Sequence, residues 1–119
     1  MPQLKVHDGI ANRILLSLPL AVLKRMRPAL ELINMARGQV LAGIDRPIKH
    51  LYFVNRGLVP LLLKTMRDGR TVEIEAVGIE GVTDPCGLFG VDWAILESVV
   101  EIPGKAFRSA FHVAGADGG

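Results

Sequence analysis

Short apolar segments separated by turn residues occupy the middle of the chain, from about residue 30 to residue 103. Strand-length segments at this spacing, divided by glycine-containing turns, are typical of antiparallel sheets that fold into a β-roll or jelly roll. Asp68-Gly69 is the strongest hairpin signal, and Asn55-Arg56-Gly57 is predicted to be a second turn. The strands are predicted at 30–35, 40–42, 50–54, 58–66, 71–77 and 95–102.

Helices are expected only at the two ends of this β region. Asn12 can cap a helix over Arg13–Ser17, since its side chain can accept from a free backbone N–H. Ser17 is expected to cap a second short helix that stops at Pro28. Apolar residues at helical spacing over Lys105–Val113 predict the start of a C-terminal helix. The expected architecture is thus mainly β, with a helical segment at about 10–28, the roll at about 30–103 and a helix stub at about 105–113.

The length of 119 residues fits one domain, residues 1–119. The single cysteine, Cys86, excludes an internal disulfide and cannot hold a metal alone. The longest nearly apolar run, Ile14–Leu23, is too short to span a bilayer. No signal segment opens the chain, so a cytoplasmic protein without a membrane partner is expected.

Charge is segregated along the sequence, although the net charge is only +2. Residues 1–70 contain twelve Lys and Arg against four Asp and Glu, whereas residues 71–104 contain seven acidic residues and no Lys or Arg. Such segregation can favour head-to-tail association or a basic surface for nucleic acid. Solvated faces of a folded roll are the simpler interpretation.

No set of residues with catalytic or metal-binding spacing is found. The three histidines, His7, His50 and His112, are far apart and have no Cys or carboxylate at ligand spacing. No serine lies in a nucleophile motif or beside a base. The sequence therefore predicts a protein that is not an enzyme, with no catalytic residues, no metal and no cofactor.

Several motifs resemble those of the cyclic-nucleotide-binding domain, most closely the sensory domain of Crp/Fnr-type transcriptional regulators. The resemblance covers roughly residues 10–111, and its most specific part is Leu51–Val59. The other matching segments are Gly38–Leu41, Asp68–Glu73, Gly78–Gly81 and Pro103–Arg108. It implies an effector-sensing domain of a homodimeric bacterial regulator that reaches DNA through a C-terminal helix-turn-helix domain. Nothing after Val113 can supply that domain, so it is expected to be absent from this chain.

Nucleotide-binding members of that family carry a cassette of the form Phe-Gly-Glu…Arg-Ala/Ser, in which Glu binds the ribose and Arg pairs with the cyclic phosphate. The corresponding stretches here contain Thr83 and Asp84, then Glu97 and Ser98. Asp84 can still accept from a ribose hydroxyl, but Glu97 stands where the arginine is expected. These four residues are the candidate pocket. Arg70 is the fifth candidate, as a cation that could replace the missing arginine; Arg56 is another residue of this type.

A cyclic phosphate needs a cation, and residues 71–104 contain none. Losing a bidentate guanidinium–phosphate pair costs on the order of 3–6 kcal/mol, or roughly 10² to 10⁴ in affinity. The sequence therefore predicts an acidic, degenerate nucleotide pocket whose effector it does not identify. Two alternatives stay open: a cyclic AMP or cyclic GMP module that uses non-standard residues, and an interaction or assembly module that works through charge segregation.

Overall fold

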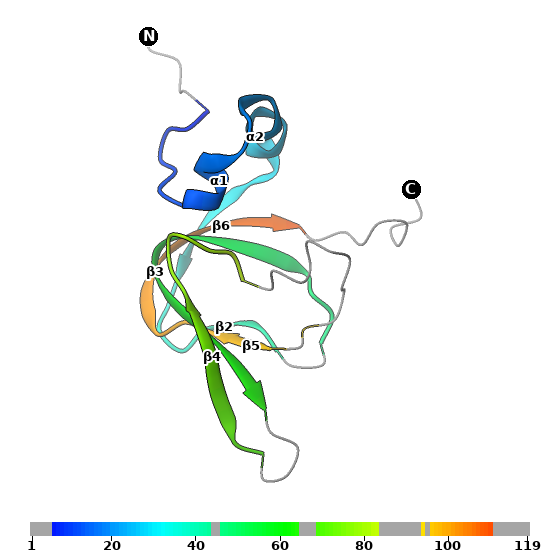
Figure 1. Ribbon diagram of the computed structural model, residues 1–119, viewed down its shortest axis with the longest axis vertical. Coiled ribbons are helices and arrows are strands. Elements are labelled where there is room, and N and C mark those ends of the chain that lie inside the picture. Colours follow the sequence, from blue (N-terminus) through cyan, green and yellow to red (C-terminus); the bar gives the residue numbers. More distant parts are fainter. Residues whose placement is uncertain (1–5, 44–45, 65–68, 84–93, 95, 111–119) are drawn as a thin grey trace.

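The computed structural model describes residues 6–43, 46–64, 69–83, 94 and 96–110. Two short helices and a 3₁₀ turn precede six antiparallel strands, which curl into a roll (Figure 1). The mainly β roll is thereby confirmed. The elements in chain order are α1 Arg13–Ser17, α2 Leu20–Met26, η1 Arg27–Ala29, β1 Glu31–Met35, β2 Val40–Ala42, β3 His50–Lys64, β4 Thr71–Val77, β5 Glu97–Val99 and β6 Ile102–Ala110.

Asn12 fixes the first helix to the roll. Its side-chain oxygen accepts from the Leu15 amide at 3.1 Å, which confirms the predicted N-cap. Its Nδ2 donates to the carbonyl oxygens of Val54 and Gly81, both at 2.7 Å. The residue is fully buried, and its hydrogen bonds to Val54 and Leu15 are buried with it.

Two expectations about the second helix were wrong in detail. Pro19, not Ser17, is the N-cap residue of α2, and it makes no side-chain cap hydrogen bond. The Ser17 hydroxyl instead donates to the Ile14 carbonyl, one turn back, which is a common alternative for a serine inside a helix. The helix ends at Met26, and Pro28 lies inside the 3₁₀ turn that follows.

The predicted turn at Asn55-Arg56-Gly57 is wrong, because β3 runs without interruption through it. The register of β3 against β6 shifts on both sides of Arg56, so the segment is a bulged part of the strand. Gly57 adopts a φ of 110°, a conformation that side chains disfavour. Gly57, on which the turn prediction rested, therefore provides the positive φ of a bulge in β3.

The bulge lets one strand serve two parts of the sheet. The strand order is β1-β6-β3-β5-β2, and β4 also pairs with β3. The first half of β3 pairs with β6, and the second half pairs with β4 and β5. The β3–β4 hairpin, predicted from Asp68-Gly69, projects from the roll (Figure 1). Asp68 itself lies outside the described residues, while Gly69 has a φ of 70°.

The C-terminal helix stub is also wrong over the described residues. Lys105–Ala110 belongs to β6, which is hydrogen-bonded to β1 on one side and β3 on the other. The predicted strand 95–102 is accordingly shorter, ending at Val99 in β5 before β6 begins at Ile102. Short apolar segments satisfy helical and strand periodicities about equally well, and here pairing on both edges decides. Residues 111–113 lie outside the described part.

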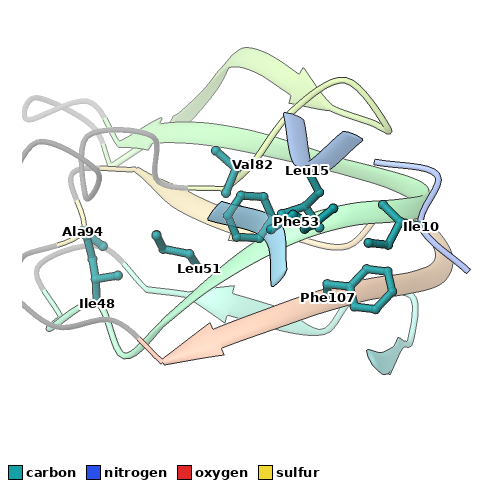
Figure 2. Packing of buried hydrophobic residues seen from close by; sticks show 9 residues of the cluster. Ile10, Leu15, Ile48, Leu51, Phe53, Val82, Ala94 and Phe107 are labelled. Atoms are coloured by element: carbon teal, nitrogen blue, oxygen red, sulfur yellow. The ribbon is translucent and has the colours of Figure 1, made fainter. Parts of the chain in front are cut away.

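Two apolar clusters hold the fold together. Phe53 and Phe107 belong to the first, together with Leu15 of α1 and Leu23 of α2. Figure 2 shows this cluster extending from Ile10 and Leu15, past Phe53, to Ile48 and Ala94 at its far end. The second cluster includes Tyr52, Val54 and Ala106. Successive residues of β3 and β6 thus enter different clusters, as the alternation of side chains along a strand requires.

Candidate ligand pocket

Thr83 is a structural residue. It is fully buried, its amide donates to the Tyr52 carbonyl at 3.0 Å, and its hydroxyl accepts from the Tyr52 amide at 3.2 Å. The neighbouring Val82 forms a β-bridge with Phe53. Thr83 therefore ties the segment after β4 back onto β3. Asp84, the next candidate, lies outside the described residues.

Glu97 and Ser98 both lie on β5, but adjacent strand residues point to opposite faces. Ser98 is fully buried, and its hydroxyl has no hydrogen-bond partner among the described residues. Glu97 is half-buried and stands opposite Leu62. The structure therefore does not bring these two side chains into one site.

Arg70 lies far from Thr83 along β3. It is exposed and directly precedes Thr71, which pairs with Lys64 at the end of β3. Thr83 contacts Tyr52, twelve residues earlier in the same strand, a path of roughly 40 Å at about 3.3 Å per residue. Arg70 is thus on the projecting hairpin (Figure 1) and does not serve a pocket at Thr83.

A cavity of about 390 Å³ lies elsewhere, at the connection between β2 and β3. We call it the basic pocket, because three of its lining residues are Arg46, Lys49 and His50. Its other lining residues are Leu41, Ala42, Gly43 and Pro47. Two backbone hydrogen bonds hold the lining of this pocket at Arg46. The Arg46 amide donates to the Gly43 carbonyl (3.2 Å), and the Ala94 amide donates to the Arg46 carbonyl (2.9 Å).

Ile48, between the lining residues Pro47 and Lys49, anchors this side of the pocket to the apolar core. It is buried in the apolar cluster that contains Leu51 and Ala94, whereas its neighbours Pro47 and Lys49 are exposed. The apolar anchor therefore holds the flanking polar and ring side chains at the cavity. Asp45, the acidic residue of this connection, lies outside the described residues.

His50 connects the basic pocket to a polar row across the sheet. Glu31, Arg108 and Tyr52 are in register on β1, β6 and β3, and Arg108 forms an ion pair with Glu31. The hydrogen bond that Arg108 donates to Glu31 in this ion pair raises the pKa of the Arg108 guanidinium. The His50 ring meets the Tyr52 ring edge to face, with centroids 6.1 Å apart.

Burial lowers the pKa of the His50 imidazole from its ordinary value of 6.5, and the positive charge of Arg108 lowers it further. Lys49 acts in the same direction, whereas Glu31 and a backbone hydrogen bond with Ser109 raise the pKa. The buried Nδ1 atom of His50 has no hydrogen-bond partner among the described residues. The balance of charge around the ring is therefore positive.

The charged residues that line the basic pocket are cationic, whereas the acidic cavity expected around residues 83–98 stays a prediction. Sequence reasoning weighed Arg56 and Arg70 as substitute cations and missed Arg46 and Lys49. The string Arg46-Pro47-Ile48-Lys49-His50, directly before a strand, was the available signal.

A second, more open groove of about 330 Å³ is lined by charges of both signs. Arg37 lies on it together with Glu73 and Glu101. Among the residues that the structure describes, no three His, Cys, Asp or Glu side chains gather as a metal site, and Cys86 lies outside them. No helix in that part of the chain is both long and apolar enough to cross a membrane.

Comparison with known proteins gives a match at the level of structure. No protein-family model matches the sequence, and no curated protein matches it. The N-terminal domain of a transcriptional regulator from Streptomyces coelicolor A3(2) superimposes with a TM-score of 0.71 at 22% identity, covering 87% of this chain and 72% of that one. The sensor domain of the transcriptional regulator DNR from Pseudomonas aeruginosa gives 0.67 at 14% identity, covering 88% of this chain and 65% of that one.

A third similar structure is the regulatory subunit of a cAMP-independent protein kinase A from Trypanosoma brucei, with a TM-score of 0.75 at 14% identity, covering 87% of this chain and 38% of that one. A triple mutant of that subunit, with arginine in place of a threonine among its changes, is bound to cAMP in its A site. At these identities the likeness establishes the fold. The chain has the cyclic-nucleotide-binding-like fold found in sensor domains of transcriptional regulators, as its motifs predicted.

Proposed function

We propose that this domain is a non-catalytic sensor of a Crp/Fnr-like bacterial regulator, in which a small-molecule effector controls the activity of an attached domain. The observation that carries the proposal is the likeness of the fold, over 87–88% of the chain, to an N-terminal domain and a sensor domain of transcriptional regulators. The motifs of residues 51–59 and 78–81 support the same assignment.

The proposal includes a nucleotide pocket that has lost its phosphate clamp. Residues 71–104 contain no Lys or Arg, and Arg70 is remote from Thr83 along β3. The same fold occurs in the regulatory subunit of a cAMP-independent protein kinase A. Kinship in fold is therefore compatible with a different ligand.

A conformational change caused by effector binding would be transmitted from the basic pocket through strand pairing. His50 lines the basic pocket and pairs directly with Ala110, the last residue of β6. A shift of His50 on ligand binding would therefore reach the segment that follows Ala110. This route replaces the helix over Lys105–Val113 that the sequence suggested.

We extend the proposal to a homodimer whose DNA binding is supplied by a separate domain, as the resemblance to transcriptional regulators suggests. Sedimentation at low and high salt tests the dimer. An association that persists at high salt supports it, whereas one that weakens as charges are screened favours assembly through charge segregation.

A chimaera tests the sensor role. The domain replaces the sensor domain of DNR, and transcription from a DNR-dependent promoter is measured across growth conditions. A promoter response that differs between conditions and depends on the exchanged domain is expected. Constant output, equal to that of DNR without any sensor domain, would contradict the proposal.

The alternative is a cyclic-nucleotide module that takes its cation from the basic pocket. Calorimetry with cyclic AMP and cyclic GMP separates the two. Micromolar affinity for either nucleotide would defeat the claim of a degenerate nucleotide pocket, while leaving the sensor role intact.

A further inference from the structure

We propose that the basic pocket is the effector site and that it selects a small organic oxyanion, with a phosphoryl or carboxylate group held by Arg46, Lys49 and His50. The inference deepens the proposed function and rests on it. It assigns the site to the β2–β3 connection, not to the stretch around residues 83–98 where the resemblance would place it.

The size of the cavity suits a small organic molecule. Its volume of about 390 Å³ lies at the lower end of the range of roughly 300–1,000 Å³ usual for small-molecule sites. A lone phosphate or sulfate would leave most of this space empty. The apolar side chains of Leu41 and Pro47 line the same cavity, so an apolar body next to the anionic group fits the lining.

The two long cations are available to a ligand. Within the described residues neither Arg46 nor Lys49 takes part in an ion pair, and the ion pair that lies nearby joins Arg108 to Glu31 on other strands. Both side chains are exposed at the pocket. A guanidinium and an ammonium that line one cavity, with no carboxylate partner among the described residues, favour an anionic occupant.

His50 adds a titratable group that is hydrogen-bonded to the Ser109 backbone but has unmet hydrogen-bonding capacity at Nδ1. Its buried Nδ1 has no partner among the described residues, and buried polar atoms in native proteins are usually satisfied. Arg108 and Lys49 disfavour its protonated form, Glu31 favours it, and Tyr52 contacts its ring. A bound anion would offset the two cations, so binding is expected to raise the pKa of His50.

Calorimetry on the full chain at low salt tests this with three probes that share a phenyl ring. Phenyl phosphate and benzoate carry the two candidate anionic groups, and benzyl alcohol is the neutral control. At least one anionic probe is expected to bind at least about tenfold more tightly than benzyl alcohol. The comparison of phenyl phosphate with benzoate identifies which anion is preferred. Equal binding of all three, or no binding of either anion, would overturn the proposal.

Charge-removing variants locate the site. Lys49→Gln and Arg46→Gln are each expected to weaken the preferred probe by at least about tenfold. Lys24→Gln removes the same charge from exposed positions of α2 and is expected to change the affinity less than twofold. Equal losses in all three variants would show non-specific attraction to a basic surface and would refute the site.

A second readout follows the His50 ring by NMR. In a titration with benzoate, whose charge is constant above about pH 6, the pKa of His50 is expected to rise, and affinity is expected to increase as pH falls. An unchanged His50 pKa at saturation would remove His50 from the site. If the anionic probe binds as expected but the chimaera is unresponsive, the sensor role is refuted and the anion site stands. If the chimaera responds but no anionic probe binds, only the anion site is refuted.

Discussion

Replacing Asn12 with alanine removes three hydrogen bonds from a position that is fully buried. The Leu15 amide loses its cap, and the carbonyl oxygens of Val54 and Gly81 lose donors that lie 2.7 Å away. The cap contributes about 1 kcal/mol, and each abandoned carbonyl costs about 1–2 kcal/mol. The expected loss in the free energy of unfolding is therefore about 3–5 kcal/mol, a large fraction of the roughly 5–15 kcal/mol typical of a domain.

Urea unfolding followed by far-UV circular dichroism measures this loss. Asn34→Ala, at an exposed position of β1, is the matched control and should change the free energy of unfolding by less than about 0.5 kcal/mol. Asn12→Ser keeps an oxygen for the cap but cannot donate to both carbonyls, so it should fall between the wild type and Asn12→Ala. If Asn12→Ala costs less than about 1 kcal/mol, the tether does not hold the helix to the roll as inferred.

Three further substitutions probe single contacts of the fold, each measured as a change in urea midpoint. Gly104→Ala places a methyl group against β3 backbone and should cost about 2–4 kcal/mol; Gly38→Ala, in open space with a φ of 83°, should cost only about 1 kcal/mol, and equal costs would rule out the steric cause. Thr83→Val leaves the Tyr52 amide without its side-chain acceptor and should cost about 1–3 kcal/mol; a neutral effect would mean that this hydrogen bond contributes nothing. Because burial lowers the pKa of His50 in the folded state below 6.5, the unfolded state binds the proton more readily, and stability should fall as pH drops from 6.5 toward the folded pKa. His50→Gln should flatten that part of the stability curve, and an unaltered pH dependence would show that His50 does not titrate there.

Local signals predicted the positions of β1, β2 and β4 along the chain well, because turn residues and apolar runs report directly on backbone preferences. They failed at Gly57, where a positive φ serves a bulge and not a turn. They failed again at Lys105–Ala110, where two neighbouring strands supply hydrogen bonds that no local pattern reveals. In both places a long-range pairing of β6 with β3 outweighed the local preference.

The candidate site was harder to predict for a different reason. Glu97 and Ser98 were grouped because both fall where the family cassette has its Arg-Ala/Ser pair, yet a strand points them to opposite faces. Arg70 was included for its charge, and the length of β3 separates it from Thr83. The residues of the basic pocket are close in sequence, between Leu41 and His50, but the family motif directed the search to residues 83–98 instead.

Strand β3 has a consequence for how the domain melts. Its 15 residues contribute Phe53 to one apolar cluster and Val54, Val59 and Leu61 to the other. Unfolding either half of the roll would disrupt β3, which both apolar clusters share. A partly unfolded state in which only one half is ordered is therefore expected to be unstable. The backbone amide hydrogens of β6, and those of β4 that are bonded to β3, should accordingly exchange with solvent only through global unfolding of the domain.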